Sequence, residues 1–419
     1  MRSRNALLAG ITTAAVMAAV VTSLVITSGG GGQALARGAA GSQFASQDQG
    51  RGRYGTEYEN TGTGPMVRPT IPTTPSVPTD FGQFQCSSRR VSSAARRASP
   101  RLPAPRGCTR VFQLTASQFE QRFANFPVQR WMVWGYNGST PGPTLISYAG
   151  ERVQIVVRNQ LPVPTTLHPH GLHQSNSQDG VAGIDETPIA PGASHTYTIT
   201  PGHVGSFAYH SHTETAVEDL RGLDGMWVVL PRWEHRSVHV QKDVVMTLQQ
   251  WAPQPIVNGM PDGTKVANDV LTVPFPGGTG DFPFSTIDGK TGEASGSPIT
   301  IHRGDMVRIR LYNASNLNHS MHLHGHDEVL VSKNGHAVPP VRETTQDVAP
   351  GDFFEIEFKA DNPGNWIFHC HVPHHTSNAK ESGYEGGPVG MTRVFHYAGY
   401  KPVPPGYFAY AGQNSTPAP

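Results

Sequence analysis

The chain repeats one histidine pattern in its two halves, and this repeat constrains the fold more than any other feature. Each half has an alternating apolar run, at 153–157 and at 307–311, followed by Asn and His-x-His-Gly, and later by an aromatic residue and a second His-x-His. Such a repeat predicts two β-sandwiches of one type. The four pairs are His168-Pro-His170, His210-Ser-His212, His322-Leu-His324 and His369-Cys-His371.

The spacing within each pair suits metal binding. Residues i and i+2 of a β-strand point to the same face, so each pair can present two imidazoles to a common site. A single His-x-His is more often explained by histidines of the core or the surface. Four pairs at matching positions, in a chain with 20 histidines, instead indicate eight ligands of a metal cluster.

Cys370 stands between the two histidines of the last pair, so its side chain points to the opposite face of that strand. A thiolate with two imidazoles and a long, weak thioether forms a blue-copper electron-transfer site. His319 and His375 can supply the imidazoles, and Met391 can supply the thioether. One strand would then join a mononuclear copper to the histidine cluster. The alternative for Cys370 is a buried, inert thiol.

The composition favours an all-β protein. Short β-prone runs separated by turn residues follow residue 109, Gly (46) and Pro (36) are frequent, and only 15% of the residues are charged. We expect one β domain at 108–235 and a second at 236–410. The net charge of +1 gives no global field that would attract nucleic acid, so no nucleic-acid partner is expected.

The first 107 residues are expected to lie outside the sandwiches. Residues 1–36 contain a long, charge-free apolar stretch, typical of a signal peptide or of a retained N-terminal anchor. Residues 37–107 are rich in Gly, Ser, Thr, Pro and Arg, which predicts a disordered, locally basic linker. Cys86 and Cys108 could close a disulfide loop or remain unpaired. The expected location is extracytoplasmic, either secreted or in the cell envelope.

The histidine segments resemble the four copper-binding motifs of multicopper oxidases, which are His-x-His-Gly, His-x-His, His-x-x-His-x-His and His-Cys-His-x-x-x-His. The match covers about residues 130–397. The resemblance implies two cupredoxin-like Greek-key sandwiches and four coppers per functional unit: one type 1, one type 2 and two type 3. It implies His168 and His322 for type 2 copper, His319, Cys370, His375 and Met391 for type 1 copper, and His170, His210, His212, His324, His369 and His371 for the type 3 pair.

Ser211 has, in the first half, the position that Cys370 has in the second, so only the second sandwich is expected to hold a type 1 copper. The chain thereby resembles the two-domain laccase subgroup and differs from copper nitrite reductases. In that subgroup the cluster lies between the first domain of one subunit and the second domain of its neighbour. The resemblance therefore implies a homotrimer, because a closed ring satisfies every heterologous interface.

Two further candidate residues follow from comparison with the family pattern, one that matches it and one that departs from it. Asp179, nine residues after the first pair, matches the family's proton-relay aspartate, although Asp-Gly is also a common turn pair. Relatives carry the axial Met five residues after the last type 1 His, where this chain has Lys380. Met391 remains the candidate, and 376–390 is expected to form a loop at the rim of the site. His374 stands where many relatives have an acid.

The resemblance implies a laccase-like enzyme that oxidises a donor one electron at a time and reduces O2 to water. Asp179 and Cys370 would be its catalytic residues. Phenols, aromatic amines and metal ions such as Mn(II), Fe(II) or Cu(I) all remain open as donors. The alternative is a non-catalytic cupredoxin protein for copper binding, copper storage or envelope structure. The complete ligand set argues against this alternative.

Overall fold

The computed structural model describes residues 64–74, 76–87, 91–125, 128–236, 239–251, 256–257, 260–261, 284–378 and 390–403. All of these lie within one compact unit, Asp48–Pro419. The expected leader at 1–36 and most of the expected loop at 376–390 fall outside the described residues. In the described ranges, none of the helices has the length and apolar character needed to cross a membrane.

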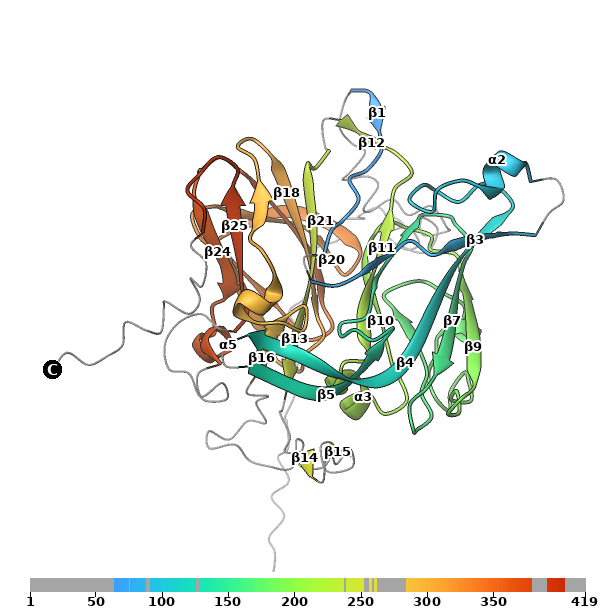
Figure 1. The fold of residues 1–419 in the computed structure, drawn as a ribbon. Coiled ribbons are helices and arrows are strands. Elements are labelled where there is room, and N and C mark those ends of the chain that lie inside the picture. The colour runs from blue at the N-terminus through green and yellow to red at the C-terminus, as the bar shows by residue number, and fades with distance from the viewer. Residues whose placement is uncertain are drawn as a thin grey trace, which may run out of the picture. The chain divides into compact units, whose positions relative to one another are not determined.

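The first sandwich consists of two sheets (Figure 1). Their strand orders are β2-β6-β11-β10-β8 and β3-β4-β7-β9, and β5 pairs with β4 outside this path. The strands are β2 (Thr79–Asp80), β3 (Gln83–Cys86), β4 (Cys108–Asn125), β5 (Val128–Tyr136), β6 (Thr144–Tyr148), β7 (Val153–Asn159), β8 (His168–His170), β9 (Ser194–Ile199), β10 (Gly205–His210) and β11 (Asp224–Leu230).

The second sandwich repeats this plan with the orders β16-β13-β18-β23-β20-β21 and β17-β25-β24-β19-β22. Its strands are β13 (Lys242–Trp251), β16 (Phe284–Ile287), β17 (Ile299–Ile301), β18 (Met306–Asn313), β19 (His319–Leu323), β20 (Glu328–Lys333), β21 (His336–Glu343), β22 (Thr345–Val348), β23 (Phe353–Lys359), β24 (Asn365–Cys370) and β25 (Thr392–Tyr397). The parallel pairs β4–β7 and β6–β11 have counterparts in β13–β18 and β17–β25. The predictions of an all-β fold and of a duplicated sandwich are confirmed.

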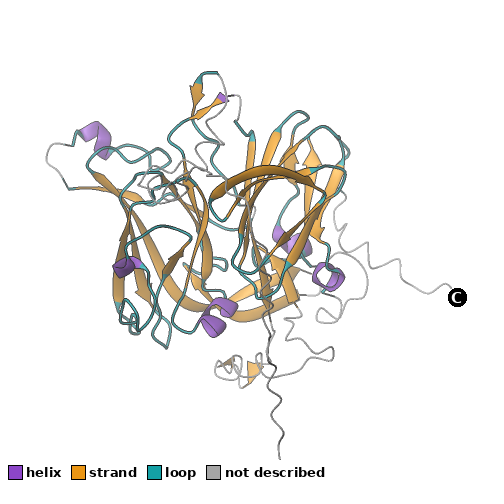
Figure 2. Cartoon of the chain, turned by 180° about the vertical axis from the view of Figure 1, so that it is seen from behind, coloured by secondary structure: helices purple, strands orange, loops and turns teal. Residues whose placement is uncertain are grey.

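The remaining elements are short, and strands dominate the described chain (Figure 2). Two small ribbons pair β1 (Met66–Val67) with β12 (Glu234–His235) and β14 (Ile256–Val257) with β15 (Met260–Pro261). The helical turns are α2 (Ser93–Arg96), η1 (Asn176–Gln178), α3 (Thr215–Glu218), η2 (Asp219–Arg221), η4 (Gly292–Ser295) and α5 (Pro373–Ser377).

A buried asparagine fixes the loop that leads to the histidines in each sandwich. The Asn159 side chain donates to the carbonyl oxygen of Val163 (2.8 Å), in the loop before His168, and to that of Ile189 (2.7 Å), in a segment that follows the histidine pair. Asn313 likewise donates to the carbonyl oxygen of Leu317 (2.7 Å), in the loop before His319, and to that of Val348 (2.8 Å), at the end of β22. Because a buried amide must satisfy its donors, these bonds hold both loops in one conformation. The Asn that the sequence repeats before each first histidine pair thus has the same structural role in both sandwiches.

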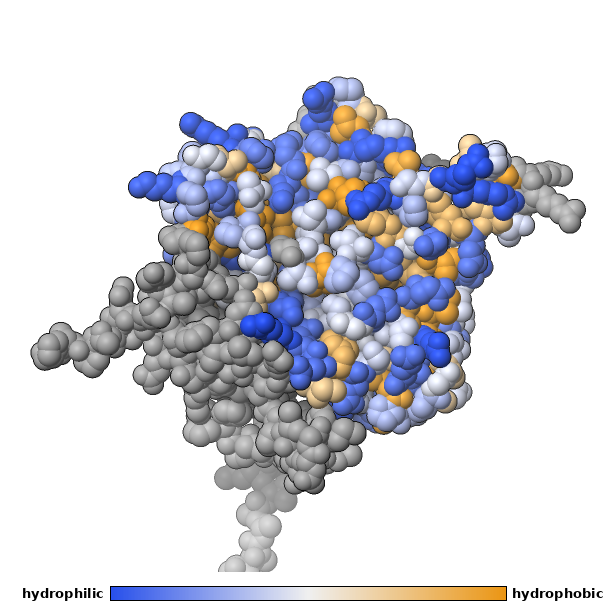
Figure 3. Space-filling view, in the orientation of Figure 1, coloured by the Kyte–Doolittle hydropathy of each residue, from blue (hydrophilic) through white to orange (hydrophobic). Residues whose placement is uncertain are grey.

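The prediction of a disordered linker over 37–107 is wrong for its described part. Within it, β2 pairs with β6, β3 pairs with β4, and a disulfide joins Cys86 to Cys108. The first sandwich therefore begins at Thr79 and not at residue 108. These strands are too short to show periodicity and are held by tertiary contacts, such as the packing of Phe81 on the core between the sandwiches. Hydrophilic residues gather on the surface at α2, with more hydrophobic ones beside them (Figure 3).

The two sandwiches share a core. Strands β6, β10 and β11 of the first sandwich pack apolar side chains against β13, β18 and β23 of the second. The buried members of this shared core are Ile146, Tyr148, Ala208, Met226, Val228, Leu230, Val245, Tyr312 and Phe353. A hydrogen bond from Gln249 Nε2 to Asp224 Oδ2 (2.7 Å) also joins the sandwiches.

The β4–β5 hairpin reaches from the first sandwich to the second. It extends below β13 and β16 in Figure 1. Near its tip, Phe123 is fully buried against Trp251 and Phe284, with ring centroids 4.8 and 6.1 Å apart. Its carbonyl oxygen accepts a hydrogen bond from the backbone N–H of Thr291 (2.8 Å). The hairpin therefore braces the two strands that lie behind one of the metal centres described next.

Candidate metal centres

One candidate centre is buried inside the second sandwich. Cys370, at the end of β24, places its Sγ 3.7 Å from His319 Nδ1 and 3.5 Å from His375 Nδ1. The possible ligand atoms of these three residues all lie within 4.8 Å of one another, and all three side chains are buried. His319 begins β19, which pairs with β24, whereas His375 comes from α5. The structure thus brings together the three residues expected to hold type 1 copper.

The outer nitrogen of each imidazole in this centre contacts a neutral polar side chain. His319 Nε2 lies 2.8 Å from the Ser315 hydroxyl, and His375 Nε2 lies 3.0 Å from the Gln250 side-chain amide. Partners at the second nitrogen fix the tautomer and the ring orientation of a metal-binding histidine. The sequence pattern did not point to Ser315 or Gln250. Gln250 is 125 residues from His375, so no local spacing could reveal it.

Burial sets the protonation states of this centre in the metal-free protein. It raises the pKa of the Cys370 thiol to about 11 and lowers the pKa of His375 to about 4. Burial also lowers the pKa of His319 well below its usual value, with the neighbouring histidines as further causes. At neutral pH both imidazoles are therefore neutral and have a lone pair for a cation. The thiol ionises when a metal binds, since coordination deprotonates a thiol.

Met391 lies beside the same centre. Its side chain is fully buried and belongs to the same core cluster as Cys370. Its carbonyl oxygen accepts from Cys370 N–H (3.2 Å), and its own N–H donates to the His375 carbonyl oxygen (2.9 Å). Gly390 before it has no room for a side chain, because a Cβ there would lie 2.1 Å from the His375 oxygen. The chain therefore returns to the centre at Met391, and its role as a ligand stays a prediction.

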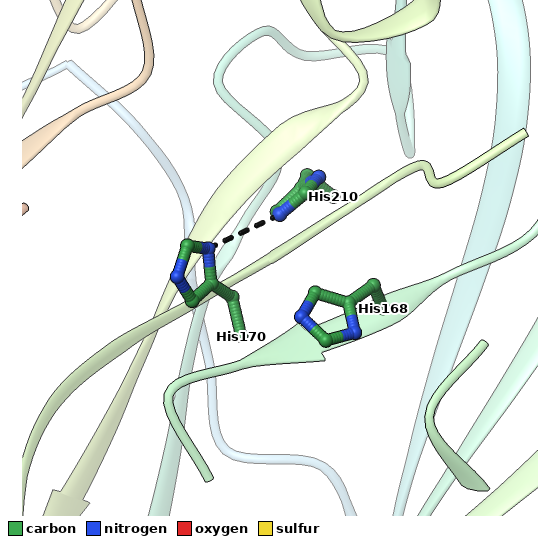
Figure 4. A group of neighbouring side chains, drawn as sticks. All are labelled: His168, His170 and His210. Atoms are coloured by element: carbon green, nitrogen blue, oxygen red, sulfur yellow. Dashed lines mark hydrogen bonds between the residues drawn. The ribbon is translucent and has the colours of Figure 1, made fainter. Parts of the chain in front are cut away.

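A first group of four histidines lies in the first sandwich, and Figure 4 draws three of them, His168, His170 and His210. The rings of His168, His170 and His210 are 5.3 to 5.5 Å apart, and His170 Nδ1 lies 3.2 Å from His210 Nε2. His212 completes the group at 5.3 Å from His168 and 6.1 Å from His210. Burial lowers the pKa of His170 to about 4, so it is neutral at neutral pH. We call this group half-site 1.

Two aspartates orient the rings of half-site 1. His168 Nδ1 donates to the Asp179 carbonyl oxygen (2.7 Å) and lies 3.5 Å from the Asp179 carboxylate. His210 Nδ1 lies 2.9 Å from Asp219 Oδ2, and burial raises the pKa of Asp219. Both contacts leave Nε2 of the imidazole for a metal. Asp179 was predicted at the site, but Asp219 was not, because its distance of seven residues from the second pair matches no motif.

A second group of four histidines lies in the second sandwich, and we call it half-site 2. The rings of His322 and His324 are 4.9 Å apart, and His369 and His371 lie 5.7 and 5.6 Å from His322. His324 Nε2 is 3.1 Å from His369 Nε2. His324 and His371 are exposed, in contrast to half-site 1.

The two half-sites remain separate within the described part of the chain. There, no ring contact or hydrogen bond joins an imidazole of half-site 1 to one of half-site 2. Each half-site therefore offers four imidazoles of its own. The eight predicted cluster histidines are grouped as two sets of four and not as one set of eight.

The first sandwich has a counterpart of the Cys370 centre without its ligands. The same two backbone hydrogen bonds occur in both sandwiches. In the second, Cys370 N–H donates to the Met391 oxygen (3.2 Å) and Met391 N–H to the His375 oxygen (2.9 Å). In the first, Ser211 N–H donates to the Leu223 oxygen and Leu223 N–H to the Glu218 oxygen, both at 3.1 Å. In the first sandwich the hydroxyls of Ser211 and Thr165 both donate to Glu218 Oε2. Each residue of the Cys370 centre has a counterpart in the first sandwich: Ser211 for Cys370, Glu218 for His375, Leu223 for Met391 and Thr165 for His319.

Comparison with known proteins agrees with this geometry. Two family models described as multicopper oxidase match residues 121–234 and 263–379. The solved structure of the multicopper oxidase mgLAC is 30% identical, with a TM-score of 0.60, over 71% of this chain and 89% of its own.

Curated relatives match over shorter stretches. Laccase-2 of Thanatephorus cucumeris is 31% identical over 250 residues, which are 55% of this chain and 41% of the relative. An iron transport multicopper oxidase of Gibberella zeae is 35% identical over 147 residues, 34% of this chain and 23% of the relative. The chain thus spans less than half the length of these two relatives. Since the family models and the similar structure cover both sandwiches with their histidines, the chain belongs to the multicopper oxidase family.

Proposed function

We propose that the protein is a laccase-like oxidase, which oxidises a reducing donor in one-electron steps and reduces O2 by four electrons to water. The observation that carries this proposal is the position of Cys370. Its side chain lies in the buried centre, while the flanking His369 and His371 belong to half-site 2. One strand thereby connects a centre with the donor atoms of a one-electron copper site to a group of four imidazoles.

The donor atoms present fit copper. A buried thiol with two neutral imidazoles and a nearby thioether suits a blue-copper site, and imidazole sets suit the remaining copper ions. The proposed type 1 ligands are His319, Cys370, His375 and Met391. We further propose type 2 ligands His168 and His322, and type 3 ligands His170, His210, His212, His324, His369 and His371. Copper, when bound, would supply the one-electron redox steps and the binding of O2.

Asp179 is proposed as the proton relay for O2 reduction, which consumes four protons per O2. Its carboxylate accepts a hydrogen bond from Gln174 Nε2 (2.6 Å) and lies 3.5 Å from His168 Nδ1. The carboxylate is about one-third exposed, at 32%. It can therefore take up a proton from water at one side and hold it beside the histidines at the other.

A homotrimer is proposed as the functional assembly. Half-site 2 is partly exposed, and the two half-sites do not meet among the described residues. A cluster that needs both would form when half-site 1 of one subunit faces half-site 2 of the next, and three copies close such a ring. A monomer that retained all four coppers in analytical ultracentrifugation would contradict this arrangement.

The proposed partners are O2 and a small donor: a phenol, an aromatic amine or a metal ion. The names of the two curated relatives, a laccase and an iron transport oxidase, support both donor classes. An extracytoplasmic location, secreted or in the cell envelope, is supported by the Cys86–Cys108 disulfide, because such bonds persist in oxidising compartments. The alternative of a non-catalytic copper protein is not favoured by any observation above.

The test is O2 uptake by copper-loaded protein, with the blue thiolate absorbance followed in parallel. We expect a phenol or Fe(II) to bleach the band and O2 to restore it. Cys370→Ser is the control, and it should bind less copper and lose both the band and the uptake. A blue protein that consumes no O2 with any donor would refute the oxidase and support copper storage instead.

A further inference from the structure

The buried centre offers no direct contact to a donor. His375 is 1% exposed, and its Nε2 faces the Gln250 amide at 3.0 Å. Gln250 is itself 2% exposed and also donates to the Ser285 hydroxyl (3.3 Å). The outer edge of His375 is therefore closed by the strands β13 and β16.

The other three residues of the centre are equally enclosed. His319, Cys370 and Met391 have no exposed surface at all. His319 Nε2 lies within hydrogen-bond distance of the Ser315 hydroxyl (2.8 Å). Because none of the four side chains reaches solvent through its outer atoms, an electron from an external donor has to pass through a neighbouring group.

His374 is a neighbour that does reach solvent. Its side chain is exposed, yet its ring packs edge-to-face on His375, with centroids 4.3 Å apart and planes at 72°. This is a shorter separation than that between the two imidazoles of the centre, His319 and His375, at 4.9 Å. The exposed imidazole thus lies in van der Waals contact with a proposed copper ligand.

The chain holds this contact in place. α5 begins at Pro373 and ends at Ser377, and Asn378 caps it. The Asn378 side chain accepts a hydrogen bond from the N–H of Ser285 (2.9 Å) and donates one to its carbonyl oxygen (2.8 Å). The Thr376 hydroxyl donates to the Cys370 carbonyl oxygen. His374 therefore sits on a turn anchored at both ends, which keeps its ring against His375.

We propose that His374 is the electron-entry residue, where a reducing donor contacts the protein and from which the electron passes through His375. This inference rests on the proposed oxidase function. Each donor molecule would lose one electron, and a copper ion held by His319, Cys370 and His375 would accept it. A phenol releases its proton to water in the same step, whereas a metal ion rises by one oxidation state. Gln250 is a positioning residue, which orients His375 and closes its outer edge.

The test is anaerobic reduction of the copper-loaded protein by a phenol, followed at the blue band in a stopped-flow instrument. We expect His374→Ala to lower the second-order rate constant about tenfold, as loss of a contact made in the transition state does. Its absorption and electron paramagnetic resonance spectra should stay those of the wild type. His374→Phe keeps a ring on His375 and should recover most of the rate.

His302→Ala is the matched control, because His302 is an exposed histidine of the same sandwich. It directly follows Ile301, which pairs with Tyr397 at the end of β25 that is farther along the chain from Met391. It should react at the wild-type rate. A wild-type rate in His374→Ala would overturn the proposal, and so would altered spectra, which would mean that His374 only supports the ligand geometry. If no donor bleached the wild-type protein, the proposed oxidase itself would fail, and this result is distinct from a defect limited to His374→Ala.

Discussion

At the scale of single residues, the two sandwiches show how one strand can serve two chemistries. At the ends of β10 and β24 the imidazoles on one face are the same in both sandwiches. The opposite face carries Ser211, directly after β10, in the first sandwich and Cys370, the last residue of β24, in the second. Because alternate side chains of a strand face opposite ways, the two faces can change independently. In the first sandwich, hydroxyl–carboxyl bonds to Glu218 fill the place that soft sulfur and nitrogen donors occupy in the second.

A second buried carboxyl gives a prediction about pH. Glu328 is fully buried, and burial raises its pKa to about 8, with the neighbouring Glu343 as a further cause. The folded protein therefore holds a proton that the unfolded chain releases above its ordinary pKa. The stability from Glu328 is complete below that ordinary pKa and is lost as pH rises towards 8, with a slope of up to about 1.4 kcal/mol per pH unit.

We expect Glu328→Gln to flatten this part of the pH dependence. Urea unfolding at pH 5, 6.5 and 8 should show a difference in unfolding free energy between wild type and variant that changes with pH. Glu343→Gln, an exposed residue paired with Glu328 across β20 and β21, should have a much smaller effect. Parallel curves for wild type and Glu328→Gln would show that Glu328 is ionised in the folded protein.

The sequence predicted the candidate metal ligands but not the side chains that hold these ligands in position. Spacing within one strand or one turn pointed to the histidine pairs, Cys370 and His375, because those distances are local. Met391 follows the segment 376–390, and only the resemblance to the family made it a candidate. Gln250 and Ser315 are ordinary polar residues, and only the folded chain brings them to the imidazoles. The grouping into two half-sites likewise depends on how the sandwiches pack, which no motif encodes.

At the scale of elements, the β4–β5 hairpin is expected to stabilise the strands behind the Cys370 centre. Phe123 packs against Trp251 and Phe284, which flank Gln250 and Ser285. Phe123→Ala should lower the unfolding free energy by about 3 kcal/mol, the usual cost of a phenylalanine cavity in a core. Denaturant titration measures this loss. Phe119→Ala, half-buried on the same hairpin, should cost clearly less, and equal losses would mean that the hairpin tip is not specially packed.

The elements also differ in how well the sequence predicted them. Long alternating runs such as β7 and β18 were visible, because one face of each is buried and apolar. The two- and four-residue strands β2 and β3 were taken for linker, since Pro and Gly surround them and their stability comes from pairing with β6 and β4. The reach of β5 onto the second sandwich also has no signal in the sequence.

At the scale of the compact unit, a buried ion-pair network joins the sandwiches. Arg310 on β18 donates to Asp243 (2.8 Å) and Glu355 (2.6 Å), and it also donates to the Ser206 hydroxyl of the first sandwich (3.1 Å). Ser206 in turn donates to Glu355 (2.8 Å). All four side chains are buried. Together with the shared apolar core, this network makes the two sandwiches one cooperative unit, which we expect to unfold in a single transition.

Arg310→Met tests that coupling. The variant leaves Asp243 buried without the cation that it pairs with, and it leaves Glu355 with only the more distant Arg308, at 3.9 Å. The unfolding free energy should therefore fall by about 3–5 kcal/mol. Arg342→Met is the control, because its ion pair with Asp327 (2.9 Å) is solvent-exposed and should be worth at most about 1 kcal/mol. Differential scanning calorimetry should show one transition that moves to lower temperature in Arg310→Met. Two separate transitions in the wild type would show instead that the sandwiches unfold independently and that the network contributes little to their association.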